Sequence, residues 1–298
     1  MNTYEKLKTR INQKYPNFAP LWKTAETDGG PAWVKEFSDH TDRVFGHSGE
    51  PGIWEAVDGY AEFCTEAIRS QIFFEKNGRY KASNYAEVLE ECYHSEDYMA
   101  RRYLPGQFLS HFIWPHHGKM LRGYTERFLP SVGDIKLFYE VGVGCGMYSL
   151  KTLEARPESH GVGFDISQYA LDFTKRVADV HDVGQRYRIE NRDIIASPPE
   201  KLADFIISQE VLEHLEDPPA FIRALRNMVR PGGHGYITAA INAGHTDHIY
   251  LYRTPDEVRR QIEEAGWKVL DQQVEFNYPD KPIQLRPTVA GYLVRKPE

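Results

Sequence analysis

The pattern of apolar and polar residues divides the chain near residue 130. Before that point, apolar side chains recur at helical spacing. One long predicted helix carries the stripe Trp54, Val57, Ala61, Cys64, Ile68 and Ile72 and ends at Asn77-Gly78. After about residue 131, short apolar runs alternate with helical stretches, which is typical of a parallel α/β sheet. The pattern predicts a mostly helical domain over residues 1–130 and an α/β domain over residues 131–298.

Seven strands and the helices between them are predicted in the second part. The predicted strands are Leu137–Val141, Gly161–Asp165, Arg186–Asn191, Phe205–Ser208, Gly235–Ile241, Lys268–Glu275 and Thr288–Arg295. The predicted helices are Tyr148–Glu154, Gln168–Val180, Pro219–Val229 and one that begins at Pro255 with Thr254 as its N-cap. The composition of Gly46–Gly52, Ser110–Gly118 and Arg230–Gly233 predicts loops or turns, and a helix is expected from about Lys119 to Phe128.

The composition narrows the class of protein. Of the 298 residues, 41% are hydrophobic and 27% are charged, which is ordinary for a soluble globular protein. A net charge of −7 argues against a nucleic-acid partner, which needs a basic face. The three cysteines have neither metal-binding spacing nor an even number, which favours a reducing cytoplasm. No signal peptide and no membrane partner are expected, because the first 16 residues are charged and no apolar run approaches membrane-spanning length.

A glycine-rich segment follows the first predicted strand. The apolar run ends at Glu140, and Gly142, Gly144 and Gly146 then occupy every second position. This order predicts a buried strand, a tight turn and the start of a helix. Because glycine has no Cβ, the backbone of such a turn can approach a ligand closely, and the helix start offers unpaired N–H groups.

The spacing of these glycines separates two classes of cofactor. A dinucleotide fingerprint requires G-x-G-x-x-G, but Met147 stands at the third glycine position. The segment Glu140-x-Gly142-x-Gly144-x-Gly146 instead resembles the first motif of class I S-adenosylmethionine (SAM)-dependent methyltransferases. This resemblance implies that Glu140 and the backbone of the turn hold the methionine end of SAM.

Two acidic positions follow at the ends of the next strands. Asp165 ends the second strand, and Ile166 follows it. The Asp165 carboxylate can accept hydrogen bonds from a ribose diol, as the corresponding residue does in NAD enzymes. Its alternative role is to cap the following helix. By the resemblance, Asp193 contacts the adenine amino group and Ile194 packs on the ring, although Asp193 could also be an ordinary turn residue.

The end of the fourth strand extends the resemblance. The segment Gln209–Leu215 looks like the "sxevlEH" segment of the small-molecule branch of the family, which implies that Gln209 and Glu210 border the SAM site. Glu213 and His214 are expected to pack against and cap the following helix. The resemblance spans roughly residues 137–266 and implies a Rossmann-like, seven-stranded mixed sheet. Residues 1–130 resemble no family that we can name.

Two histidine-rich segments supply candidates for the methyl acceptor side. The predicted substrate-binding residues are His111, Trp114, His116, Tyr250 and Tyr252. The candidate bases are His117, His245 and His248, since a neutral histidine can take a proton near pH 7. The pair His245-x-x-His248 with Asp247 between them could also bind a metal, but no metal ligand is included in the prediction.

The leading hypothesis is a cytoplasmic SAM-dependent methyltransferase that acts on an O, N or C atom of a small metabolite or secondary metabolite. The N-terminal helices would form a lid and acceptor pocket, and a homodimer is a further expectation. One alternative is an NAD(P)-dependent oxidoreductase, which would share Asp165 but requires a glycine at Met147. Another is a non-catalytic partner subunit, which would predict a degenerate glycine turn.

Overall fold

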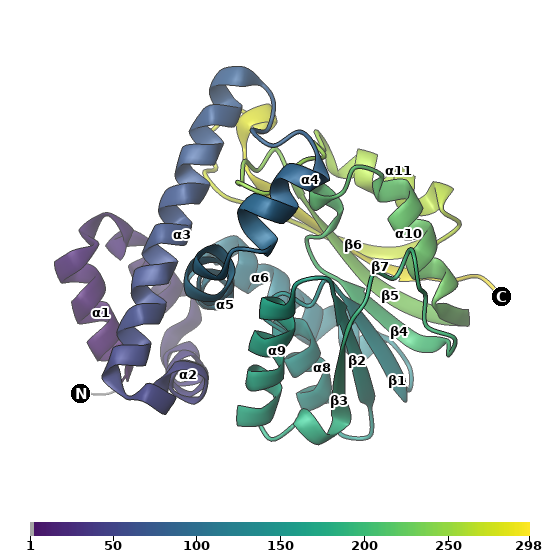
Figure 1. Ribbon diagram of the computed structural model, residues 1–298, viewed down its shortest axis with the longest axis horizontal. Coiled ribbons are helices and arrows are strands. Elements are labelled where there is room, and N and C mark those ends of the chain that lie inside the picture. Colours follow the sequence, from purple (N-terminus) through teal and green to yellow (C-terminus); the bar gives the residue numbers. More distant parts are fainter. Residues whose placement is uncertain (1–2) are drawn as a thin grey trace.

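The computed structural model describes residues 3–298, and a single seven-stranded sheet organises its C-terminal part (Figure 1). The strands are β1 (Leu137–Val141), β2 (His160–Asp165), β3 (Tyr187–Asn191), β4 (Ala203–Ser208), β5 (Val229–Ile241), β6 (Lys268–Phe276) and β7 (Thr288–Arg295). Their order is β3-β2-β1-β4-β5-β7-β6. The pairings among β1, β2, β3, β4 and β5 are parallel, and β7 runs antiparallel to both of its neighbours, β5 and β6. The predicted seven-stranded mixed sheet is thus confirmed.

Helices from the C-terminal part cover both faces of the sheet. They are α8 (Met147–Ala155), α9 (Gln168–Val180), α10 (Pro218–Asn227) and α11 (Pro255–Glu264). α8 and α9 share an apolar cluster with one face, and α10 and α11 share a second cluster with the other. The predicted cap of α11 is confirmed, because the Thr254 hydroxyl accepts the N–H of Glu257.

The N-terminal part is helical, as predicted. Its α-helices are α1 (Thr3–Lys14), α2 (Ala19–Phe45), α3 (Glu50–Asn77), α4 (Tyr85–Val88), α5 (Leu104–Ile113), α6 (Pro115–Gly123) and α7 (Leu129–Ser131). Three π-helical segments, Leu89–Tyr93, Asp97–Tyr103 and Tyr124–Phe128, lie among them. Among residues 3–298, no helix combines the length and the apolar character needed to cross a bilayer.

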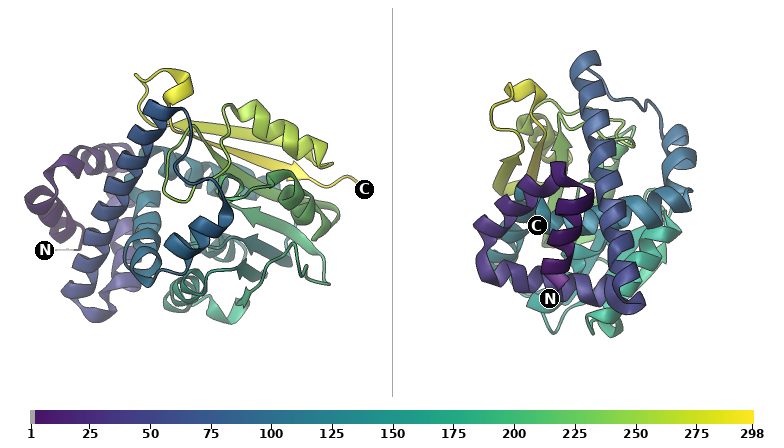
Figure 2. Two further views of the ribbon diagram at one scale, coloured as in Figure 1. Left: turned by 45° about the horizontal axis from the view of Figure 1, so that its top comes forward. Right: turned by 90° about the vertical axis from the view of Figure 1, so that its left-hand side faces the viewer.

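The N-terminal helices pack directly on the sheet, as Figure 2 shows from two further sides. α6 contacts β6 and β7. One apolar cluster runs from Phe37 in α2 through Phe108 in α5 to Phe205 in the sheet. The buried hydroxyls of Tyr124 and Thr152 are hydrogen-bonded at 2.6 Å across the same boundary. The helices of residues 3–130 therefore share their core with one face of the sheet, and the domain division at residue 130 stays a prediction.

Three predicted loops are shorter in the structure, and each difference has a local cause. The predicted loop Gly46–Gly52 is wrong at its end, because α3 already begins at Glu50; its Pro51 suits the first turn of a helix. The predicted turn Ser110–Gly118 consists almost entirely of α5 and α6, with only the extended Trp114 between them, so α6 begins at Pro115 rather than near Lys119. Arg230–Gly233 belongs to β5 and is irregular there, since Gly232 has a φ of 73°.

The predicted stripe of α3 is buried along only part of its length. Val57, Ala61 and Cys64 are buried, but Ile68 is 42% and Ile72 is 60% exposed. The last turns bury Gln71 and Phe74 instead, and the helix ends at Asn77 before Gly78, whose left-handed φ of 67° suits a C-terminal glycine.

Gly59 lets the backbone of α3 approach the segment Asp97–Tyr103 closely, and this close approach can be tested. A Cβ at Gly59 would overlap the backbone carbonyl oxygen of Arg101, which cannot rotate away as a side chain can. We expect Gly59→Ala to lower the free energy of unfolding by about 1–3 kcal/mol, measured by urea denaturation. Gly46→Ala is the matched control, since its Cβ would meet nothing closer than Asp42 Oδ1 at 3.8 Å. An equal loss in both variants would contradict the close approach.

Candidate functional site

The glycine turn between β1 and α8 has the open backbone that the sequence predicts. Gly142, Gly144 and Gly146 have φ values of 74°, 49° and 72°, all in the left-handed region. Residues with a Cβ rarely adopt this conformation, so the turn depends on glycine for its shape. Val211 packs where a Cβ of Gly142 would lie. A side chain at Gly142 would therefore collide with Val211.

A cavity of about 520 Å³ lies beside this turn; we call it the large cavity. Its lining includes most of the predicted cofactor-binding residues: Gly142, Gly144, Asp165, Ile166, Asp193, Ile194, Gln209 and Glu210. They come from the ends of four neighbouring strands, β1 to β4, and the segments that follow. This is the place where open α/β sheets bind ligands.

Asp165 and Asp193, the two predicted aspartates that line the large cavity, are both held by backbone N–H groups. Asp165 Oδ1 accepts the N–H of Ser167 at 2.9 Å, and its Oδ2 lies 3.5 Å from the Gly144 nitrogen. Asp193 Oδ1 accepts the N–H of Ile195 at 2.8 Å. Burial raises the pKa of Asp165. Fixed carboxylates of this kind can accept hydrogen bonds from hydroxyl and amino groups of a ligand.

The structure places Glu140 and Gly146 outside the lining of the large cavity. The buried Glu140 carboxylate accepts the N–H of Ser149 at 3.2 Å in the first turn of α8, and burial raises its pKa to about 8. Gly146 packs against the side chain of Thr174 in α9. In this structure both residues hold the turn against its helices rather than face the cavity.

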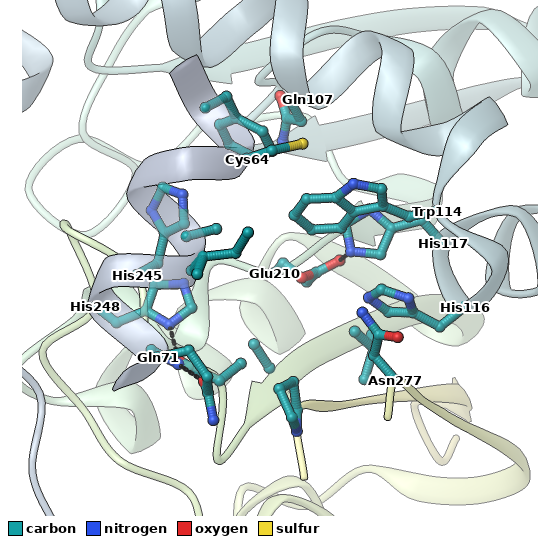
Figure 3. Close-up of a pocket in the computed structure, with 18 of the residues that line it drawn as sticks. Cys64, Gln71, Gln107, Trp114, His116, His117, Glu210, His245, His248 and Asn277 are labelled. Atoms are coloured by element: carbon teal, nitrogen blue, oxygen red, sulfur yellow. Dashed lines mark hydrogen bonds and ion pairs between the residues drawn. The ribbon is translucent and has the colours of Figure 1, made fainter. Parts of the chain in front are cut away.

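A smaller cavity of about 130 Å³ lies between α3, α6 and the loop after β5; we call it the small cavity. The predicted residues of the acceptor side that line it are Trp114, His116, His117, His245 and His248. Figure 3 shows His245 and His248 across the space from the other three, with Glu210 between them. Much of the remaining wall is apolar, including Phe63, Cys64 and Ile68. Such a wall with a few convergent polar groups is typical of small-molecule sites.

The two cavities meet at a shared wall. The residues that line both are Tyr103, Gln107, Gln209, Glu210 and His214. A group that passes from a ligand in one cavity to a ligand in the other must cross at this wall.

His117 is a neutral imidazole in this arrangement. Its Nδ1 lies 2.9 Å from the Ser110 hydroxyl, and its Nε2 lies 3.9 Å from Glu210. Burial, with His111 and His245 nearby, lowers the pKa of His117 well below its usual value. Near pH 7 the His117 ring is therefore neutral and can accept a hydrogen bond.

His245 is paired with a buried carboxylate. Its Nδ1 lies 2.6 Å from Asp247 Oδ1, and Asp247 is completely buried. Burial alone would lower the pKa of His245, but the Asp247 charge outweighs it and raises that pKa. Three neighbouring histidines in turn hold the pKa of Asp247 below its usual range against the effect of burial. The pair fixes Nδ1–H toward the carboxylate and leaves Nε2, which has no partner in residues 3–298, as the proton acceptor.

Three predicted substrate-binding residues do not line the small cavity. His111 is buried beside the glycine turn, where its Nδ1 donates to the Gln107 carbonyl at 2.8 Å. Tyr252 is buried on the other face of the sheet and donates to Gln261 of α11, whose amide also donates to Tyr250. β5 ends at Ile241, and the chain after it turns so that Tyr250 and Tyr252 contact α11 instead of the small cavity.

Sequence reasoning missed several residues of the shared wall and its surroundings. Gln107 accepts the N–H of Cys145 through Oε1 at 2.9 Å, which joins α5 to the glycine turn. Glu213 and His214 do not cap α10, because Asp217 does so by accepting the N–H of Ala220 at 3.0 Å. The sequence Asp217-Pro218 before the apolar run is the N-cap signal that identifies the true cap.

Known methyltransferases are similar in sequence to the part of the chain that contains the large cavity. The family model of a methyltransferase domain matches residues 139–234. A ubiquinone biosynthesis O-methyltransferase of Acinetobacter baylyi is 29% identical over 51% of this chain and 73% of its own length. The enzyme of the same name from Ralstonia nicotianae is 35% identical over 43% of this chain, and the match spans 59% of that relative.

Solved structures share the fold at low sequence identity. The N-methyltransferase NodS from Bradyrhizobium japonicum, in complex with S-adenosylhomocysteine, has a TM-score of 0.52 and 19% identity over 72% of this chain and all of its own. The mitomycin 7-O-methyltransferase MmcR has a TM-score of 0.55 and 12% identity over 81% of this chain and 71% of its own. Fold and site thus define a class I methyltransferase. Residues 139–234 form a methyltransferase domain of the SAM-dependent class, and SAM is its cofactor. The oxidoreductase and non-catalytic alternatives receive no support.

Proposed function

We propose that this enzyme transfers the methyl group of SAM, bound in the large cavity, to a hydroxyl oxygen of a compact, largely apolar acceptor bound in the small cavity. The observation that supports it best is the His245–Asp247 pair, which is buried in the small cavity close to the wall shared with the large one. The names of the O-methyltransferase relatives agree with oxygen as the acceptor atom.

The cofactor would be held by the residues at the strand ends. Asp165 is suited to the ribose hydroxyls, Asp193 and Ile194 to the adenine, and the glycine turn to the methionine end, as the family resemblance implies. When bound, SAM supplies a methyl group on a positively charged sulfur. The chain must align the acceptor oxygen with that methyl group and exclude water.

His245 is the residue that we propose as the base. As the acceptor oxygen forms its bond to the methyl carbon, the bond between sulfur and that carbon breaks, and the hydroxyl proton passes to His245 Nε2. Asp247 holds the imidazole in the required tautomer and stabilises the imidazolium that forms. His117 and His248 are the other predicted bases. His117 is proposed to hydrogen-bond the acceptor instead, because Glu210 lies near its Nε2.

The N-terminal helices are proposed to cover the site as a lid and acceptor pocket over residues 1–130. Two contacts support this role. The Gln107 side chain touches the glycine turn, and Glu216 accepts the N–H of Tyr85 at 2.8 Å. The three cysteines are buried free thiols, which fits the proposed cytoplasmic location. The homodimer stays a prediction.

An acceptor screen tests the choice of oxygen. The purified enzyme is incubated with SAM and either a small phenol or the matched aniline, and S-adenosylhomocysteine and methylated product are measured by mass spectrometry. We expect product with hydroxylated aromatic acceptors and at least about a hundredfold less with amines. Turnover of the amine at the rate of the phenol would contradict oxygen transfer, while the methyltransferase assignment would stand.

A further inference from the structure

Glu213 carries a completely buried carboxylate on the wall of the small cavity. Neither carboxylate oxygen has a hydrogen-bond partner in residues 3–298. Buried carboxylates of this kind are normally paired or bound to a metal.

Two histidines next to Glu213 each have one ring nitrogen fixed and the other free. Nδ1 of His248 donates to the Ala243 carbonyl at 2.7 Å. Nδ1 of His214 lies 3.1 Å from the Asp247 carbonyl oxygen and 3.4 Å from its carboxylate. No hydrogen bond within residues 3–298 engages Nε2 of either ring. Metal-binding histidines have this arrangement, in which a carbonyl or carboxylate orients the ring through the nitrogen that does not bind.

We propose that Glu213, His214 and His248 bind a divalent cation, for which Zn²⁺ is the best match. One donor atom from each of the three residues lies within 4.8 Å of the others, so small side-chain movements of about 1 Å bring them to coordination distance. Two imidazoles and one carboxylate form a ligand set typical of catalytic zinc, with a fourth position open.

A second triple, His245, Asp247 and His248, is equally compact but less suited to bind. Oδ1 of Asp247 is engaged by His245 at 2.6 Å and its Oδ2 lies 3.4 Å from His214 Nδ1, so we assign Asp247 to orient the histidines rather than to bind the cation.

The place of this cation indicates what it would do. All three ligands line the small cavity, and His214 also lines the large one, so the open position faces the acceptor. There the cation would bind the acceptor oxygen and lower the pKa of its hydroxyl group, which makes the proton easier for His245 to remove. This role rests on the proposed function, whereas cation binding itself does not.

Calorimetry on the full-length protein, stripped of metal with a chelator and titrated with ZnCl₂ alone, tests the site. We expect one saturable site, and we expect Glu213→Gln and His248→Ala to weaken Zn²⁺ affinity about a hundredfold or more. His116→Asn is the matched control, because it alters another buried histidine of the same cavity outside the cluster and should leave the affinity unchanged. Absence of a saturable site, or equal affinity in wild type and Glu213→Gln, would overturn the proposal.

Thermal unfolding gives a second measure that does not depend on activity. Without metal, Glu213→Gln should unfold at a higher temperature than wild type, because it removes an unpaired buried carboxylate. With Zn²⁺, the wild type should gain stability and the variant should not. A Zn²⁺-induced gain of the same size in the variant would contradict these ligands. Neither experiment contains SAM or an acceptor, so a failed acceptor screen would leave the result for the cation site intact.

Discussion

Gly144→Val is expected to weaken the binding of S-adenosylhomocysteine at least about a hundredfold. Gly144 lines the large cavity with a φ of 49°, where a β-branched residue is strained. Its Cβ would lie 2.5 Å from Gln107 Oε1, and the valine methyl groups would extend into space that the ligand needs. The protein should stay folded, because the nearest atoms belong to the end of a flexible side chain.

Calorimetry measures this loss of affinity, and circular dichroism measures the fold. Gly133→Val is the matched control, because a Cβ at Gly133 would meet no atom within 4 Å and the residue lies outside both cavities. Undiminished affinity in a folded Gly144→Val variant would remove the glycine turn from the cofactor site. A parallel loss in the control would assign the effect to general destabilisation.

The sheet and its ligand-binding edge could be predicted from the sequence because they depend on local signals. β1 and α9 have the predicted bounds, since an apolar run or a helical stripe is a property of consecutive residues. The residues that line the large cavity could also be predicted from the sequence. Carboxyl ends of adjacent parallel strands must meet, so order along the chain predicts proximity in space.

The small cavity could be predicted only in part, because distant segments form it. Cys64 of α3, His117 of α6 and His245 after β5 come together through helix packing that no short motif records. Tyr250 was predicted to bind the substrate because the loop after the fifth strand should lie over the carboxyl edge of the sheet, but the structure pairs Tyr250 with Gln261 of α11. Glu213 was expected to pack beside a helix, and its lack of a partner is visible only once its neighbours are known.

His245→Ala is expected to lower turnover about a hundredfold while SAM affinity stays nearly unchanged. Loss of a general base typically costs 10²- to 10⁴-fold, and we expect the low end because the proposed cation would still lower the pKa of the acceptor hydroxyl. SAM affinity should persist because His245 lines the small cavity and not the large one.

Single-turnover kinetics with saturating SAM and a phenolic acceptor measure the chemical step of this variant, and calorimetry measures SAM affinity. His160→Ala is the matched control, since His160 is exposed at the start of β2, at the sheet edge opposite the cavities. Turnover within a fewfold of wild type in His245→Ala would reassign the His245–Asp247 pair to packing. His117 would then be the base to test, because its low pKa already keeps it neutral and its Nε2 faces Glu210 on the shared wall. If the rate falls as expected, Zn²⁺ affinity should not fall with it, since His245 is not among the proposed ligands. The two roles in the small cavity can thus be separated by one variant.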